Sequence, residues 1–224
     1  FREAAEKLAP LVQILHEKYK LELFSFGGGI GIVYENSLAS GPADWWTQND
    51  IKALKPGDYA VALESLFAPL GLKILFEPGR FLVGNAGVLL SEVQYVKQTP
   101  TKRFTIVDAA MNDLIRPALY EGHHDIHPLR EPTANSELLP TDIVGPVCES
   151  GDFFAQDRAL PPLEQGDRIA LMSAGAYGFV MASNYNSRPL LPEVLVSEDR
   201  WKIIRDRQTY ADLTAGEHLL SDTD

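Results

Sequence analysis

The hydrophobic pattern of this chain changes character near residue 84, and that change limits the folds that it can adopt. Before it, helix-like and strand-like segments alternate. Residues 1–19 place apolar side chains three and four positions apart, as an amphipathic helix does, and residues 21–26 are typical of a short buried strand. A second helix pattern over 58–71 and a second buried strand over 72–80 follow. This order predicts an α/β unit with parallel strands.

Strand-like segments dominate the chain after this change. Turn-rich stretches separate them, notably residues 121–142. Short strands with turns between them are typical of antiparallel β structure. We therefore predict two domains, an α/β domain over 1–84 and an antiparallel β domain, a barrel or sandwich, over 85–224. The strand-like segments are 86–99, 102–110, 145–150, 167–175, 192–196 and 202–209.

Composition and charge exclude several classes of protein. The 224 residues are 45% hydrophobic, which is enough for a sizeable core. The formal net charge of −11 argues against a nucleic-acid partner, which favours a basic patch. The apolar runs are too short to span a membrane. The single cysteine, Cys148, cannot form an internal disulfide, so we expect a reducing compartment, the cytoplasm.

Two of the predicted strands end in glycine turns that suit ligand binding. Gly27, Gly28 and Gly29 follow the first strand and can donate backbone N–H groups to a phosphate, although a tight turn in a barrel is an equal alternative. The second strand ends in Glu77–Arg80. Active sites of α/β barrels lie at the carboxyl ends of their strands, so the two turns predict a polar site. The alternative is a surface turn whose arginine pairs with a nearby acid.

Cys148 lies in the segment GPVCESGD, where two interpretations compete. A free cysteine is usually a small buried apolar residue. The flanking acids Glu149 and Asp152 and the glycines Gly145 and Gly151 favour a loop instead. A loop cysteine beside a carboxylate is a candidate proton donor. The neighbouring negative charges favour the neutral thiol, which suits that role.

Two further motifs have weaker signals. In HHDIHP, His123 and His127 are four residues apart and would share one face of a helix, as metal ligands can. Pro128 follows and no helix pattern surrounds them, so packing or a pocket wall is the favoured interpretation. Tyr177 lies between small residues in AGAYG, which favours a side chain that projects from exposed backbone.

Five segments of this chain, taken in order, resemble the motifs of one family. They are FSFGGGIGIVY, FEPGRFLVGNAGVLLSEVQYVK, IVDAAMNDLIRPALY, GPVCESGD and AGAYGFVMASNYNSRPLLPEVLV. They resemble the diaminopimelate decarboxylases, and the resemblance extends from about residue 1 to about residue 213. It implies a fold of the alanine-racemase type, in which a (β/α)8 barrel that binds pyridoxal 5'-phosphate precedes a β domain. It also implies a cytoplasmic homodimer with composite active sites.

The resemblance also implies how the cofactor is held. Gly27, Gly28 and Gly29 would bind its phosphate through backbone amides, and the turn at Gly79 and Arg80 would add to that cradle. The carboxylate of Glu77 would face the pyridine nitrogen and keep the ring protonated, which makes the ring a better electron sink. Tyr177 would contact both the cofactor and the substrate.

The same resemblance implies the substrate site of a lyase. Arg80, Arg116 and Tyr120 would bind the substrate, because the planar guanidinium group suits a carboxylate. Cys148 would come from the partner subunit and protonate the carbanion, and Glu149 would take the distal ammonium group. Arg116 and Tyr120 are four residues apart, so on a helix both can face one pocket.

The chain departs from the family in one respect. The family's cofactor-binding lysine lies near the start of the barrel, and Lys52, Lys55 and Lys73 have the wrong neighbours for it. The chain also begins without Met, in a helix pattern. We therefore expect about half of an enzyme, inactive as a fragment alone.

Two alternatives remain open. The first is a related decarboxylase that acts on ornithine, arginine or a carboxylated polyamine such as carboxynorspermidine. Diamine-forming relatives tend to carry Asp after the cysteine, whereas this chain has Glu149. The second is a non-catalytic fragment or dimerisation module, which the absence of the lysine motivates.

Overall fold

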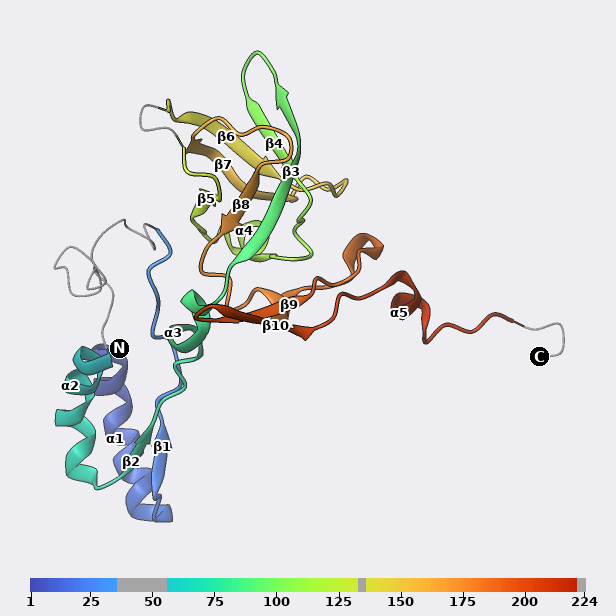
Figure 1. Cartoon of the computed structure of the whole chain (residues 1–224). Helices are drawn as coiled ribbons and strands as arrows, with labels where there is room; N and C mark the ends of the chain where they lie inside the picture. The colour runs from blue at the N-terminus through green and yellow to red at the C-terminus, as the bar shows by residue number, and fades with distance from the viewer. Residues whose placement is uncertain (36–55, 133–135, 221–224) are drawn as a thin grey trace.

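The computed structural model describes residues 1–35, 56–132 and 136–220. The N-terminal part is an α/β unit of two short strands with two helices packed beside them (Figure 1). β1 and β2 pair in parallel, with Phe24 opposite Ile74, which confirms the predicted parallel arrangement. The elements are α1 (Arg2–Tyr19), β1 (Leu23–Ser25), α2 (Pro56–Phe67), the 3-10 turn η2 (Ala68–Leu70) and β2 (Lys73–Leu75).

The α/β unit has an apolar core of its own. α1 contributes Ala5 and Val12, which lie two turns apart on one face. Leu11 and Ile14, which the sequence pattern suggests as a widening of that apolar face, are exposed instead. The buried residues of this core are Ala5, Val12, Ile30, Tyr59, Leu63, Phe67 and Leu72. The core is therefore built between the two helices and the two strands, and it leaves the outer flank of α1 uncovered.

The larger part of the chain forms a curled six-stranded sheet with strand order β5-β8-β3-β4-β6-β7 (Figure 1). The central strand β3 pairs with both β4 and β8, and its register places Val93 opposite Val107. Its strands are β3 (Leu89–Gln98), β4 (Arg103–Val107), β5 (Ile126–Pro128), β6 (Leu139–Val144), β7 (Phe153–Leu160) and β8 (Arg168–Leu171).

The prediction of a purely antiparallel sheet is wrong at one pair of strands. β4 and β6 run parallel, with Thr105 opposite Ile143, whereas the other neighbouring pairs are antiparallel. Parallel neighbours need a crossover connection. Here the connection includes α4 (Arg116–Tyr120) and β5, which joins the far edge of the sheet. The sheet is therefore mixed, and the pairings within the described residues leave β5 and β7 as its edges.

A second apolar core fills the concave side of this sheet. Val93 and Val107, opposite each other on neighbouring strands, are fully buried together with Ile143 and Ile169. The buried residues of this core are Val93, Val107, Ala109, Leu114, Ile126, Ile143, Phe154, Ala155, Leu160, Leu163, Ile169 and Leu171. The two cores share no residue, so each part of the chain buries its own apolar face.

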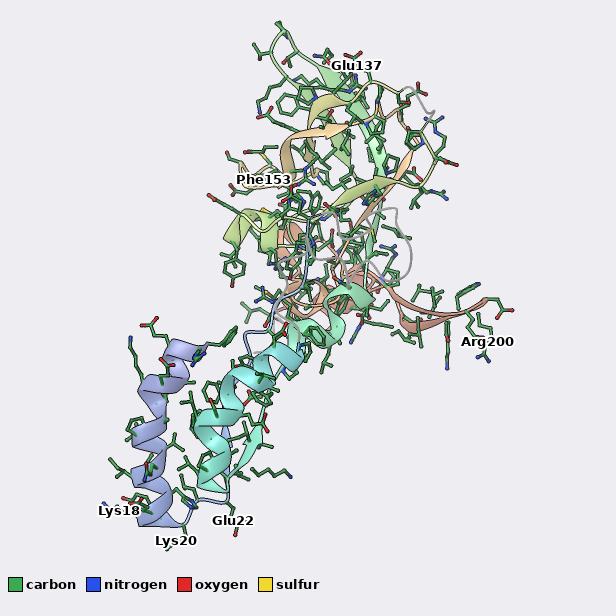
Figure 2. The ribbon with its side chains drawn as sticks, turned by 90° about the vertical axis from the view of Figure 1, so that its left-hand side faces the viewer. Lys18, Lys20, Glu22, Glu137, Phe153 and Arg200 are labelled. Atoms are coloured by element: carbon green, nitrogen blue, oxygen red, sulfur yellow. The ribbon has the colours of Figure 1, made fainter. Side chains whose placement is uncertain are left out.

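Shorter elements connect and follow these two parts. A hairpin of the two antiparallel strands β9 and β10 lies beside the six-stranded sheet (Figure 1). Among the described residues, no helix is long and apolar enough to cross a membrane. Figure 2 shows Lys18 and Glu22 at one end of the molecule and Glu137 at the other. The remaining elements are α3 (Gly79–Val83), η3 (Gly84–Ala86), η4 (Phe179–Met181), η5 (Tyr185–Ser187), β9 (Glu193–Ser197), β10 (Arg200–Arg205) and α5 (Tyr210–Thr214).

Candidate active site

The glycine run begins one residue, Phe26, after the carboxyl end of β1. Gly27 and Gly29 have φ angles of +72° and +94°, a region of backbone conformation that favours glycine. Gly28 is required for another reason, because a Cβ atom there would lie 2.5 Å from the carbonyl oxygen of Glu77. The local backbone therefore explains why glycine is present at each of the three positions. Because glycine has no side chain, the backbone amides of the run are open to a ligand.

This run and the end of β2 are joined by hydrogen bonds. The Glu77 amide donates to the Gly27 carbonyl at 2.9 Å, which extends the parallel ladder beyond the strands. The Ser25 hydroxyl donates to Oε1 of Glu77 at 2.5 Å, and it accepts a hydrogen bond from the Gly27 amide at 3.2 Å. Sequence reasoning missed Ser25, although its place at the end of β1, two residues before the run, was a usable signal.

The arrangement at these two strand ends can hold an anion beside a carboxylate. The amides of Gly28 and Gly29 meet no acceptor within the described residues, and Arg80 forms no ion pair there. The Gly79 amide donates to the Glu77 carbonyl at 2.9 Å, which turns the chain into α3. Free backbone N–H groups and a guanidinium group bind phosphate well. These residues fit a phosphorylated ligand with a basic ring nitrogen.

Arg116, another predicted site residue, lies in a buried and hydrogen-bonded environment. It begins α4 and is only 8% exposed. Its Nη1 atom lies 2.8 Å from Nε2 of His124, and its guanidinium group lies 4.4 Å from the ring centroid of Tyr34. Buried charges are nearly always paired, yet Arg116 makes no ion pair with a carboxylate of the described residues. It can therefore receive a carboxylate from a ligand.

His124, which sequence reasoning assigned to packing or a pocket wall, orients this arginine. The side chain is fully buried, and Nδ1 lies 2.7 Å from the carbonyl oxygen of Met172. A carbonyl only accepts, so Nδ1 carries the proton and Nε2 accepts from Arg116. Burial, opposed by the Met172 carbonyl and assisted by the positive charge of Arg116, lowers the pKa of His124 to about 4. The histidine is therefore neutral at pH 7.

Tyr120 lies in the predicted helix with Arg116 but in a different environment. It is the last residue of α4 and is 61% exposed, whereas Arg116 is buried. No contact joins the two side chains in the described structure. The helical spacing is confirmed, and the shared pocket stays a prediction.

The segment that carries Cys148 is a loop, so the strand expected over 145–150 is wrong. The loop closes through short-range backbone hydrogen bonds, such as that from the Glu149 amide to the Val147 carbonyl. Cys148 is a free, exposed thiol, which also removes the buried interpretation. The Tyr185 hydroxyl donates to Oε2 of Glu149 at 3.3 Å, and the negative charge of Glu149 raises the pKa of Tyr185.

Tyr177 projects from a tight turn that packs on the segment after Arg80. Its φ angle is +58°, unusual for a bulky residue, and its side chain is 47% exposed. The Gly175 amide donates to the Gly84 carbonyl at 3.0 Å, and a Cβ atom on Gly175 would collide with the carbonyl oxygen of Val83. Small residues around Tyr177 thus allow the two backbones to approach closely.

The other candidates are placed differently. His123 and His127 do not share a helix face, because β5 extends the backbone there. His123 instead lies 2.9 Å from Asp125 through its Nε2 atom and also contacts Arg158. Within the described residues, no three side chains of His, Cys, Asp or Glu lie close enough together to hold a metal ion. Of the lysines considered, Lys73 lies in β2 with an exposed side chain, and Lys52 and Lys55 lie outside the described residues.

Comparison with known proteins identifies the protein family that this chain matches. Residues 24–175 match the family described as "Pyridoxal-dependent decarboxylase, C-terminal sheet domain". The chain is 43% identical over 211 residues to the diaminopimelate decarboxylase of Aquifex aeolicus, covering 94% of this chain and 47% of that protein. The chain therefore spans about half the length of the curated relatives that it matches.

Solved structures agree with this comparison. The structure of diaminopimelate decarboxylase from Helicobacter pylori complexed with L-lysine matches with a TM-score of 0.82 at 42% identity, over 96% of this chain and 49% of that one. The enzyme from m. jannaschii in co-complex with L-lysine matches with a TM-score of 0.85 at 35% identity, over 98% and 48%. The match to the family covers more than half of this chain, and the chain belongs to the pyridoxal-dependent decarboxylases.

Proposed function

We propose that the complete protein decarboxylates meso-2,6-diaminopimelate to L-lysine and carbon dioxide, as a carboxy-lyase that uses pyridoxal 5'-phosphate. The observation that carries this proposal is the juxtaposition of the Gly27–Gly29 run with Glu77, which fits the family's cofactor. The substrate follows from relatives 41–45% identical that are named diaminopimelate decarboxylase. It also follows from the solved structures of two diaminopimelate decarboxylases, 42% and 35% identical to this chain, each in complex with L-lysine.

The cofactor site is assigned to residues at the two strand ends. The Gly27–Gly29 run binds the phosphate through its backbone, with the amides of Gly28 and Gly29 as the donors that have no acceptor in the described structure, and Gly79 with Arg80 completes that cradle. When bound, pyridoxal 5'-phosphate supplies an electron sink for the bond that breaks at the α-carbon of the amino acid. The Glu77 carboxylate, oriented by the Ser25 hydroxyl, holds a proton on the pyridine nitrogen. Tyr177, which projects from its turn, contacts cofactor and substrate.

The substrate is recognised by its charges. Arg116 binds a carboxylate through its planar guanidinium group, which is already desolvated and oriented by His124. Arg80 and Tyr120 add further contacts to the substrate. Glu149 binds an ammonium group, and the Tyr185 hydroxyl fixes the direction of its carboxylate. Two carboxylate-binding arginines suit a substrate that has two carboxylates.

The thiol of Cys148 is the proton donor. It is exposed on its chain, at the tip of a loop, and so is available to a neighbouring subunit. We assign it to the active site of the partner in a homodimer with composite sites. Its role is to place a proton on the carbon that has lost carbon dioxide. A free thiol at this position also fits a reducing compartment, the cytoplasm.

For the complete protein we propose a (β/α)8 barrel, to which residues 1–84 contribute their parallel strands, followed by a β domain over 85–224. The parallel pairing of β1 with β2 and the two separate apolar cores support this division. The mixed curled sheet is the framework of the β domain.

Rates with competing substrates test the proposal. The complete enzyme, saturated with cofactor, is given meso-diaminopimelate, ornithine and arginine in turn, and carbon dioxide and the amine product are measured. We expect kcat/KM to be highest for meso-diaminopimelate. A higher value for ornithine or arginine would replace this function with that of a diamine-forming relative. No decarboxylation of any substrate would support a non-catalytic module instead.

A further inference from the structure

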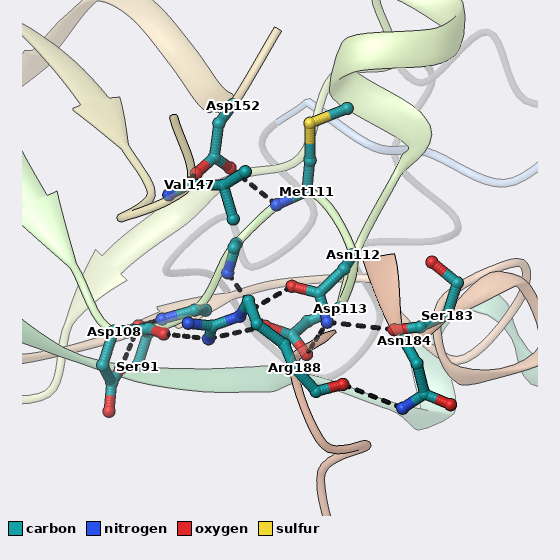
Figure 3. A network of polar contacts seen from close by, with 12 residues as sticks. Ser91, Asp108, Met111, Asn112, Asp113, Val147, Asp152, Ser183, Asn184 and Arg188 are labelled. Atoms are coloured by element: carbon teal, nitrogen blue, oxygen red, sulfur yellow. Dashed lines mark hydrogen bonds and ion pairs between the residues drawn. The ribbon is translucent and has the colours of Figure 1, made fainter. Parts of the chain in front are cut away.

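One buried carboxylate connects the loop that carries Cys148 to the segment that leads to Arg116. Asp152 is 4% exposed and lies between the Cys148 loop and β7. Its Oδ1 atom accepts from the Met111 amide at 2.7 Å, and its Oδ2 atom accepts from the Val147 amide at 2.7 Å. Figure 3 shows these two bonds, which join parts of the chain 36 residues apart (147 − 111). We name this pair of bonds the Asp152 bridge.

Each end of the Asp152 bridge adjoins a proposed functional residue. Val147 immediately precedes Cys148, so its amide is fixed one residue before the residue that bears the thiol. Met111 lies in the segment that leads into α4, where Arg116 is the first residue. The bridge therefore fixes the backbone of the donor loop relative to the backbone that carries a substrate-binding arginine.

The Met111 end of the bridge is itself held in place. Nε of Arg188 donates to Oδ1 of Asn112 at 2.8 Å, and its Nη2 donates to the Asp108 carbonyl at 2.6 Å. Asn112 also donates to the Ser183 carbonyl at 3.1 Å. Figure 3 shows these bonds gathered around Asn112 and Arg188, next along the chain from Met111. The Cys148 loop is thus attached to a segment that is itself held by hydrogen bonds to Arg188 and Ser183.

The loop is shaped around this carboxylate. A Cβ atom on Gly145 would lie 2.4–2.7 Å from the carboxylate atoms of Asp152, so only glycine leaves room for it. The backbone closes the same ring, because the Gly145 amide donates to the Asp152 carbonyl and the Asp152 amide donates to the Glu149 carbonyl, each at 3.0 Å. Burial raises the pKa of Asp152, while the two bridging amides lower it. A buried carboxylate is costly, and its hydrogen bonds compensate only in this geometry.

We propose that Asp152 is a positioning residue that holds the Cys148 thiol at its place of proton transfer through the Asp152 bridge. This inference rests on the proposed function for the role of Cys148. Asp152 itself contacts neither substrate nor cofactor. Its effect is on the location of the thiol, whereas the Glu149 carboxylate is held separately by the Tyr185 hydroxyl.

Asp152→Asn in the complete holoenzyme tests the proposal. The amide keeps the shape but has one acceptor oxygen, so one bridging N–H then faces an NH2 group. We expect kcat to fall about tenfold or more, because a misplaced donor loses part of its usual contribution, with KM for meso-diaminopimelate within about twofold. We also expect Cys148 to react faster with iodoacetamide, measured by peptide mass spectrometry without substrate. A kcat and an alkylation rate equal to those of the wild type would overturn the proposal.

Asp142→Asn is the matched control. Asp142 is similarly buried, accepts a backbone N–H from Asp157 at 2.7 Å and pairs with Lys102 at 2.8 Å, but it makes no bond to the Cys148 loop. It should lose stability without a change in alkylation rate. An equal change in both variants would reduce Asp152 to a merely structural role and overturn the proposal.

Hydrogen exchange of the unmodified enzyme covers the case in which Asp152→Asn fails to fold. The Met111 and Val147 amides should exchange at least about tenfold more slowly than the Cys148 amide, because both are bonded in the bridge. Rapid exchange at Val147 would contradict the bridge directly. The exchange and alkylation measurements do not need turnover, so a failure of the proposed function leaves them interpretable.

Discussion

Nε2 of His124 lies 2.8 Å from Nη1 of Arg116, and both side chains are buried. This contact is favourable only while the histidine is neutral, because a protonated ring would present a second positive charge and an N–H group to the guanidinium. The Met172 carbonyl fixes the proton on Nδ1 and so leaves Nε2 free to accept. The protonation state of one histidine therefore controls the orientation of the arginine proposed to bind substrate.

We predict that the free energy of unfolding falls as the pH drops from about 6.5 to about 4. Burial lowers the pKa of His124 to about 4, whereas the unfolded chain keeps the ordinary value of 6.5. The unfolded chain thus binds the extra proton in that window, and the stabilising contribution, present in full above it, is lost. The total loss is roughly 3 kcal/mol. Urea unfolding at several pH values measures it.

His124→Gln separates this effect from other titrations. The variant should lose the pH dependence between 4 and 6.5, whereas His127→Gln, at an exposed position in β5, should keep it. Burial raises the pKa values of Asp113 and Asp152, which act in the opposite direction, but both residues are present in all three proteins. Identical curves for wild type and His124→Gln would contradict the assignment.

Arg116→Ala should weaken substrate binding more than it slows the chemical step. Its bond to a substrate carboxylate exists before and during the reaction, so KM for meso-diaminopimelate should rise about 10- to 100-fold while kcat changes little. Arg116→Lys keeps the charge without the planar fork and should give an intermediate KM. Steady-state kinetics of the complete enzyme decide this. A collapse of kcat at constant KM would show that Arg116 acts in the transition state instead.

Gly28→Ala should weaken cofactor binding at least about tenfold. The new Cβ atom would lie 2.5 Å from the Glu77 carbonyl oxygen, so the ends of β1 and β2 must move apart and displace the amides of the run. Gly31→Ala is the control, because its Cβ meets nothing within 4 Å in the described structure. Fluorescence titration of the apo-enzyme with pyridoxal 5'-phosphate measures both. Equal affinities for both variants would remove the run from the phosphate site.

The parts of the fold that were predictable have local signals. α1 shows its 3.6-residue period, and Gly71 stops the second helical segment with a φ angle of +68°. The parallel pairing of β4 with β6 had no such signal, because alternation along a strand does not report the direction of its neighbour. β7 was missed because charged residues and a positive φ at Asp157 interrupt its alternation.

The candidate site shows the same limit. The glycine run and Glu77 were recognisable because each follows a strand end, and strand ends of parallel sheets converge. Their connection through Ser25 was not, because its partner lies 52 residues away. His124 was visible as a residue but not as the partner of Arg116, since only the return of the chain through α4 and β5 brings them together.

Cys148→Ala should slow product formation in the complete enzyme by about 10²-fold or more, which is the usual share of general-acid catalysis. Cys148 is exposed, so the change should leave the free energy of unfolding within about 0.5 kcal/mol of the wild-type value. That separates a chemical defect from a folding defect. Single-turnover rates of lysine formation provide the measurement, with KM as a second readout. Because the thiol is assigned to the partner's site, mixed dimers of Cys148→Ala with a cofactor-site variant should recover activity at one of their two sites. Recovery would place the donor across the interface, and an unchanged single-turnover rate in Cys148→Ala would remove it from the mechanism.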